Sequence, residues 1–199
     1  MRTLIPVFFV LSLGASATAL AAPVTYEVDA KHTHPHFEAD HFGGVSVWRG
    51  GFNASGGSIV LDRDAQSGTV DVTIDTTTVL TGVPDLDKHL KSADFLDVEK
   101  FPTITFKSKK IEAGAAGHTK VTGDLTLHGM TKEVVLDVEG PTPVIKDPMG
   151  NTKAGAHATT KINRKDFGIV WNKSLDGGGL MVGDDIDVTI DIEAVKKGD

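Results

Sequence analysis

The sequence predicts an all-β protein whose strands run antiparallel and whose single helix is short. The first observation is strict alternation: from Ile186 to Ile192 every second residue is aliphatic, and the residues between are aspartate or threonine. Side chains of a strand alternate between its two faces, so this segment has one apolar and one wet face. Parallel strands are buried on both faces and read as continuous apolar runs, so the alternation indicates antiparallel sheets.

The second observation is that the same alternation recurs between turn signals. Glycine-containing pairs such as His128-Gly129 separate neighbouring segments, as hairpin turns do. We expect about eight or nine strands on this pattern. The other clear segments are residues 69–75, 102–108, 120–129 and 131–140.

One stretch breaks the alternation and predicts a short helix from Pro84 to Ser92. Proline suits the first helical turn, Asp85 complements the helix dipole there, and Leu86 and Leu90 lie four apart on one face. Many strands with one helix leave a sandwich or a closed barrel, and the pattern alone does not choose between them. A small barrel lined mostly by aliphatic residues leaves room for an internal cavity.

The N-terminal residues 1–21 predict a secretory signal peptide. Arg2 precedes a short apolar run that ends in the small-residue box Ala19-Leu20-Ala21. Cleavage there leaves a mature single domain of residues 22–199. The chain contains no cysteine, which excludes a lipoprotein anchor, a disulfide and a thiolate ligand. Export without disulfides favours a periplasmic location, with free secretion as the alternative.

Charge and motifs narrow the partners and activities. The formal net charge is −7 at pH 7 and the mature chain has no basic cluster, which disfavours nucleic acid and anionic membrane surfaces. The apolar run near the N-terminus is too short to span a bilayer. The chain has no Gly-x-Ser-x-Gly elbow, His-Glu-x-x-His motif or phosphate-binding glycine loop, so we expect a non-enzymatic protein without a cofactor.

Residues 31–41, KHTHPHFEADH, contain four of the eight histidines. His32, His34 and His36 would project from one face of a strand, and a His-x-His pair is a ligand spacing for zinc or copper. Two features oppose a metal site: Phe37 begins an apolar face of opposite parity, so the three histidines would point outward, and Pro35 interrupts the strand ladder. A metal-binding protein using this face is kept as the alternative function.

Four further polar residues are candidates for contact with a ligand. His41 either donates to a polar head group at a cavity mouth or is a core histidine bonded to a carbonyl. Arg164 either holds an anion or forms a turn-stabilising ion pair, and Arg49 is the other arginine that could face an anion. His89 lies in the expected helix. An enzyme acting on a bound lipid, with His41 or His89 as general base, is a third hypothesis for which the sequence shows no catalytic partner.

Several segments in fixed order carry a resemblance. The most specific are residues 87–106 and 123–132, and the others are YEVDAKHT at 26–33, RGGF at 49–52, INRKDFGIVWN at 162–172 and VGDDIDVTIDIEAV at 182–195. Together they cover nearly the whole mature chain. On these segments the chain resembles the YceI-like family, also called the polyisoprenoid-binding family of periplasmic proteins.

The resemblance implies an antiparallel eight-stranded lipocalin-like barrel with one short helix, formed by residues 22–199. It implies that the barrel binds, transports or sequesters a long-chain isoprenoid or other amphiphilic lipid, and dimerisation is expected from the resemblance alone. The weaker candidates for a head group are His41, Arg49 and Arg164. The candidates for lining the cavity are chosen by their position on the apolar face of a strand, except Phe42 and Trp171, which are chosen for their bulk. They are Phe37, Phe42, Val72, Ile74, Phe106, Leu125, Leu136, Trp171, Val188 and Ile190.

The chain departs from the family pattern at residues 32–37, which read HTHPHF where members carry His-Ser, an apolar residue and phenylalanine. Part of the histidine cluster is therefore extra to the shared motif. Such a site needs little polar chemistry, because each buried methylene contributes about 0.8 kcal/mol. About ten buried carbons then correspond to micromolar affinity before ordering costs.

Overall fold

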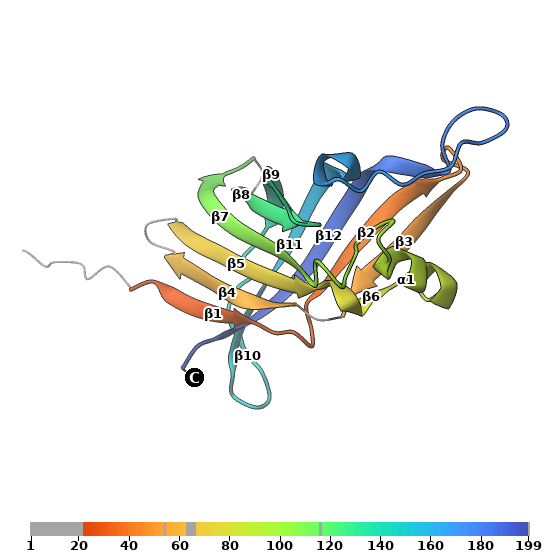
Figure 1. Ribbon diagram of the computed structural model, residues 1–199. Coiled ribbons are helices and arrows are strands. Elements are labelled where there is room, and N and C mark those ends of the chain that lie inside the picture. The colour runs from red at the N-terminus through yellow and green to blue at the C-terminus, as the bar shows by residue number, and fades with distance from the viewer. Residues whose placement is uncertain (1–21, 54, 63–66, 116, 199) are drawn as a thin grey trace, which may run out of the picture.

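In the computed structural model, the described residues 22–198, apart from 54, 63–66 and 116, form one twelve-stranded sheet with one α-helix (Figure 1). The expected signal peptide, residues 1–21, lies outside the described residues. Every strand pairing is antiparallel, as the alternation predicts. The strands are β1 Val24–Val28, β2 His34–His41, β3 Ser46–Phe52, β4 Ser55–Asp62, β5 Ser67–Asp75, β6 Val79–Leu80, β7 Thr103–Ala113, β8 His118–Leu127, β9 Met130–Glu139, β10 Ile145–Lys146, β11 Thr152–Asn163 and β12 Val182–Lys196.

Eight of these strands close into a barrel. Their order around the ring is β11-β9-β8-β7-β5-β4-β1-β12, and β12 returns to pair with β11. That closing pair runs from Lys153 opposite Val195 to Asn163 opposite Asp185. The eight-stranded barrel is therefore confirmed and the sandwich is excluded.

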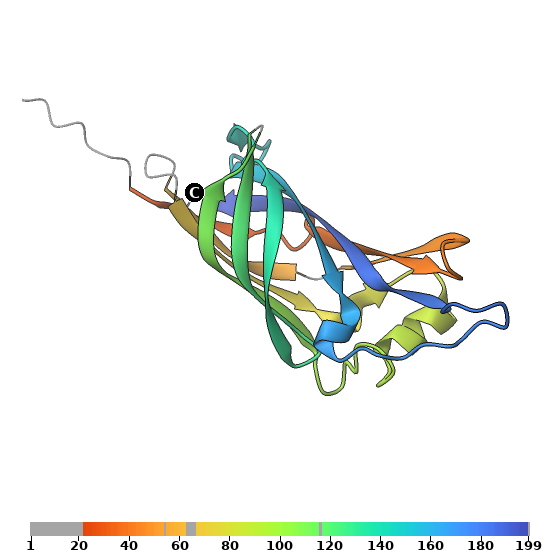
Figure 2. The same cartoon turned by 90° about the horizontal axis from the view of Figure 1, so that it is seen from above.

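The remaining strands extend the sheet beyond the ring. The long β12 pairs with β1 near its C-terminal end and with β2 along the rest of its length, and β2 continues into β3 and β6. In Figure 2 the β2–β3 hairpin projects past the barrel at one end, beside the loop that leads into β12. The short β10 adds to β11. The twelve strands exceed the expected eight or nine because of these additions.

The helix α1, Pro84–Lys91, lies at the same end as the β2–β3 hairpin (Figure 1). It confirms the expected helix, with Pro84 in its first turn and Ser92 as its C-cap. Its N-terminal side is anchored by Asp87, whose carboxylate accepts hydrogen bonds from the Thr81 amide and hydroxyl, both at 2.6 Å. Among the described residues, no helix combines the length and apolar character needed to cross a membrane.

The interior is divided between two apolar clusters. A small one, built on Tyr26, Ala154 and Ala194, packs the end of the barrel near the C-terminus. A larger one lies at the other end; it is built on seven buried residues, among them Phe52, Phe95 and Phe167, and on eight partly buried hydrophobic residues packed against them. Residues of this larger cluster therefore also form part of the wall of an internal space at the helix end of the barrel.

Candidate ligand-binding cavity

The candidate site is an apolar cavity of about 240 Å³ inside the helix end of the barrel. Residues from β1 to β5, from β7, β8, β9, β11 and β12, and from α1 border it. Two-residue alternation on each strand places every second side chain in the interior, which is why so many strands contribute. The cavity reaches the surface near Trp48, which borders it and is 36% exposed.

Cross-strand register assembles the lining into rows. Val72 of β5 lies opposite Phe106 of β7, and Phe106 lies opposite Leu125 of β8, so three strands present one apolar row. Beside it, Gly123 leaves space for the Phe106 ring: a Cβ at Gly123 would stand 2.6 Å from the ring carbon Cζ. On the other wall, Val188 lies opposite Phe37.

The helix covers this end of the cavity with two leucines. Leu86 and Leu90 of α1 border the cavity, as do Phe95 and Leu96 of the segment that follows. The four-residue spacing of Leu86 and Leu90 was the sequence signal for this contact, but the lining prediction omitted both residues. Ile104, Ile186 and Ile192 were also missed, although they share the parity of predicted lining residues on their own strands.

The buried polar side chains in the lining already have partners in the protein. The Thr33 hydroxyl donates to the Glu193 carbonyl at 3.1 Å and accepts from the Glu193 amide at 3.0 Å. The Ser55 hydroxyl donates to the Thr33 carbonyl at 2.9 Å. Buried polar groups must find such partners to avoid a desolvation cost. The interior therefore offers a ligand an apolar surface rather than polar contacts.

Eight of the ten predicted lining residues border the cavity, and Phe42 and Trp171 do not. Phe42 lies in the turn after β2 with φ of 54° and is exposed. Trp171 packs against Phe95 and His89, with ring centroids 5.2 and 4.7 Å away. Both were chosen for bulk rather than parity, and large aromatic side chains also occur in turns, as Phe42 does, or pack against the core away from the cavity, as Trp171 does. The eight that border it are Phe37, Val72, Ile74, Phe106, Leu125, Leu136, Val188 and Ile190.

The three head-group candidates are placed differently from one another. His41 does not border the cavity, because it lies at the end of β2, in the part of the β2–β3 hairpin that extends beyond the barrel. Its Nδ1 lies 3.3 Å from the Ser46 hydroxyl. Arg49 is exposed and forms a two-pronged pair with Glu38, at 2.7 and 3.1 Å. Arg164 borders the cavity but is buried, with only 3% of its surface exposed.

Arg164 is held by strand β12 and by the loop before it. Its Nε donates to the Gly183 carbonyl at 2.9 Å, and its Nη1 donates to the carbonyls of Ile169 and Trp171 at 2.9 and 2.8 Å. Its Nη2 donates to Asp184 Oδ1 at 3.0 Å. Lys165 and then Arg164 hold the pKa of Asp184 below its usual range. Of the two roles the sequence left open, these contacts match the structural one.

The predicted three-histidine face does not form. His32 lies in the turn before β2, so it shares no strand with His34 and His36. The His34 Nε2 lies 3.1 Å from the Lys31 carbonyl, and His36 is exposed and borders the cavity. The expectation was wrong for His32 because the strand begins two residues later than the spacing suggested.

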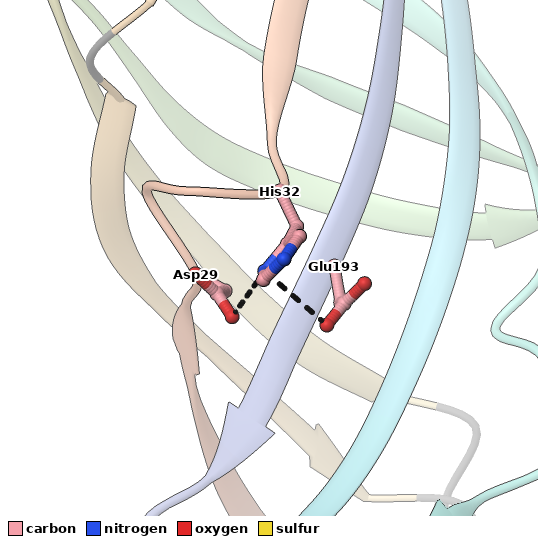
Figure 3. Close-up of side chains that lie close together, drawn as sticks. All are labelled: Asp29, His32 and Glu193. Carbon is pink, nitrogen blue, oxygen red and sulfur yellow. Dashed lines mark hydrogen bonds and ion pairs between the residues drawn. The ribbon is translucent and has the colours of Figure 1, made fainter. Parts of the chain in front are cut away.

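His32 instead joins Asp29 and Glu193, whose ligand atoms lie within 4.8 Å of one another (Figure 3). The hydrogen bond with His32, at 2.9 Å, is the largest cause that lowers the pKa of Asp29 to about 2. The Lys153 ammonium lies 2.5 Å from Glu193 Oε1 and 3.3 Å from Asp29 Oδ2. A metal ion here would have to displace that ammonium, so the cluster is a lysine-centred ion network.

His89, the other histidine considered for catalysis, does not border the cavity itself. Its Nε2 lies 3.0 Å from Asp94 Oδ2, and its ring meets Phe95 and Trp171 edge-on. These contacts fasten the outer side of α1 to the loop before β12. His89 and His41 are both absent from the cavity border, so neither is placed to act on a ligand inside it.

Comparison with known proteins gives the family. The model of the YceI-like domain matches residues 26–194. A UPF0312 protein of Vibrio cholerae is 35% identical over 197 residues, covering 98% of this chain and 99% of the relative. A UPF0312 protein of Pectobacterium atrosepticum is 35% identical over 201 residues, covering 98% of each chain.

Solved structures share the fold. A Campylobacter jejuni YCEI protein superposes with a TM-score of 0.65 at 33% identity, covering 77% of this chain and 87% of its own. Burkholderia cenocepacia BcnA gives a TM-score of 0.70 at 19% identity, covering 83% and 98%. A polyisoprenoid binding domain from Saccharophagus degradans gives 0.62 at 13% identity, covering 87% and 99%. With a matching domain model and relatives above 30% identity along almost its full length, the chain belongs to the YceI-like family.

Proposed function

We propose that this protein binds the long apolar chain of an isoprenoid or other amphiphilic lipid inside the barrel, as a carrier or sequestering protein and not as an enzyme. The observation that carries the proposal is a cavity bordered mostly by aliphatic and aromatic side chains, whose buried polar members Thr33, Ser55 and Arg164 bond within the protein. Such a surface gains free energy from apolar contact alone.

The volume sets how much of a ligand the cavity takes as it stands. A methylene group is close to a water molecule in size, and water takes about 30 Å³, so 240 Å³ accommodates about eight chain carbons. Burying eight methylenes yields about 6 kcal/mol. A longer chain must either move α1, which covers this end with Leu86 and Leu90, or leave part of itself outside the mouth.

The related structures guide the choice of probe. The Saccharophagus domain is described as polyisoprenoid binding, and at 13% identity it supports the fold of this chain and suggests an isoprenoid for testing. We also infer that the protein acts in the periplasm, on the signal-peptide pattern of residues 1–21. Cell fractionation and N-terminal sequencing test this: a mature chain beginning at Ala22 in the periplasmic fraction is expected, and an uncleaved cytoplasmic chain contradicts it.

Filling the cavity tests the binding proposal. Leu125→Trp adds a bulky ring to the lining, whereas Val135→Trp places the same residue at an exposed position on neighbouring β9. Farnesol and dodecanol are titrated against a fluorescent fatty-acid probe. We expect Leu125→Trp to weaken both by about tenfold or more, with Val135→Trp unchanged.

Two results oppose the proposal. Equal affinity in Leu125→Trp and the wild type, with both folded by circular dichroism, would show that the probes bind elsewhere. Native mass spectrometry of protein purified from its own host supplies the second measurement. A co-purifying amphiphile is expected, and a ligand-free spectrum together with no measurable binding of either alcohol overturns the proposal.

A further inference from the structure

The tip of the β2–β3 hairpin is an uncharged, exposed apolar segment. Residues 42–48 read FGGVSVW and carry no ionisable side chain. Val45 is 81% exposed, and Phe42, Val47 and Trp48 are each exposed by more than a third. In Figure 2 this hairpin projects beyond the barrel at the end where α1 lies. A contiguous patch of exposed apolar residues often marks an interaction surface, whereas single exposed apolar residues are common and need no explanation.

The tip is held in its exposed position by the backbone. Phe42, Gly43 and Gly44 have φ values of 54°, 66° and 90°, a run in the left-handed region that costs energy at a phenylalanine. The Phe42 amide donates to the Met181 carbonyl at 2.8 Å, which ties the hairpin to the loop before β12. The exposure of Phe42 is therefore part of a fixed turn.

The apolar tip is continuous with the cavity. Trp48 belongs to the tip and also borders the cavity, and Ala39, its partner across the β2–β3 ladder, borders it as well. Val182, the partner of His41 on β12, completes this margin. Asp40, which is exposed and lies opposite Val47, also borders the cavity here, so a chain leaving the cavity would pass this carboxylate and then follow the apolar side chains of the tip to Val45, which is 81% exposed.

We propose that this tip inserts into the interface of a lipid bilayer with uncharged head groups, and that the ligand passes between bilayer and cavity along it. The inference rests on the proposed function, because it supplies the route by which an insoluble chain is loaded. Tryptophan favours the membrane interface, and the paired charges Arg49 and Glu38 lie just behind the tip, where head groups would be. The net charge of −7 and the absence of basic residues from the tip select a neutral surface over an anionic one.

The opposite end of the barrel provides a matched comparison. There Ile145 of β10 is 61% exposed and Met149 lies nearby, but Lys146 and Asp147 interrupt the apolar surface. The barrel at that end is packed by the Tyr26 cluster. It therefore has exposed apolar residues without an uncharged tip or an adjoining cavity.

Vesicle binding tests the proposal directly. Trp171→Phe leaves Trp48 as the only tryptophan, so its emission reports the tip. With vesicles of phosphatidylcholine alone, we expect a blue shift and co-sedimentation that do not weaken as salt rises. Val45→Asp should lower the vesicle partition by about tenfold or more, while Ile145→Asp, the same change at the other end, should leave it unchanged. Co-sedimentation with vesicles is repeated for Val45→Asp and Ile145→Asp in the chain that keeps Trp171, to check that Trp171→Phe does not itself change vesicle binding.

The outcomes separate this inference from the proposed function. Binding of farnesol measured without vesicles should be equal in Val45→Asp and the wild type, while transfer of farnesol from vesicles to protein should slow about tenfold or more in the variant. No vesicle partition by the wild type, or equal loss in Val45→Asp and Ile145→Asp, overturns the membrane role even if farnesol still binds. A Val45-dependent dimer in analytical ultracentrifugation, with no vesicle binding, assigns the tip to a second copy and likewise overturns it.

Discussion

Replacing Arg164 with methionine should destabilise the protein through lost hydrogen bonds rather than through lost ligand contact. The side chain is 3% exposed and donates four hydrogen bonds, to three carbonyls and to Asp184. Methionine fits a similar volume but donates nothing. The three carbonyls, from Gly183, Ile169 and Trp171, would then be buried without these partners.

The expected magnitude follows from these contacts. Asp184 keeps its ion pair with Lys165 at 2.6 Å, so the cost comes mainly from the three carbonyls; at about 1–3 kcal/mol for each unsatisfied buried group, their loss should total about 3–5 kcal/mol. In a chain of this size each kcal/mol lowers the Tm by about 2–4 °C, so Arg164→Met should lower it by about 6–20 °C. Arg164→Lys keeps the charge but loses the planar fork that reaches carbonyls on both β12 and the loop before it, and should still be clearly destabilised.

Thermal and urea unfolding followed by circular dichroism measure the effect. Arg49→Met is the matched control, because Arg49 is exposed and its pair with Glu38 should contribute less than about 1 kcal/mol. The reasoning is refuted if Arg164→Met and Arg49→Met have equal Tm values. A folded Arg164→Met variant of unchanged stability that fails to bind farnesol would instead make Arg164 a ligand-contacting residue.

Three other predictions concern the fold. The folded pKa of Asp29 is lowered to about 2, so its bond with His32 stabilises the protein at pH values above the unfolded pKa of about 4. This contribution to stability is lost as the pH falls towards 2. Asp29→Asn should cost about 1 kcal/mol at pH 7 and flatten the urea-unfolding profile between about pH 4 and 2; an unchanged profile contradicts this assignment. Gly57→Ala should lower the free energy of unfolding by about 2 kcal/mol or more, because its φ is 141° and the new Cβ would stand 2.1 Å from a carbonyl oxygen of β5. Gly56→Ala is the control, because a Cβ there would meet open space. Equal stabilities of the two variants in urea unfolding would refute the steric argument. Phe167→Ala, at a position only 1% exposed, should cost about 3–5 kcal/mol in urea unfolding, and a loss below about 1 kcal/mol would show that the site collapses around the cavity.

Local periodicity predicted those parts of the site that depend on one strand at a time. Val72, Phe106 and Leu125 border the cavity because alternation fixes which face of a strand a residue occupies, whatever its neighbours are. Bulk carries no such information, and the two residues chosen by it, Phe42 and Trp171, lie elsewhere. The spacing of His32 also misled, because a turn precedes β2 and resets the side-chain direction.

By itself the sequence determined the antiparallel strands, the helix from Pro84 and the aliphatic faces, since each depends on neighbours within a few positions. The resemblance to a family, and not the alternation, favoured a barrel. Only the tertiary structure decided how β11 and β12 close the ring, because register between strands depends on all the pairings together. It alone brought Lys153 to Asp29, 124 positions away, and surrounded Arg164 with carbonyls from strand β12 and from the loop before it. Those contacts decide the roles of polar residues because a charge's function depends on its partners, and partners distant in the chain leave no local pattern.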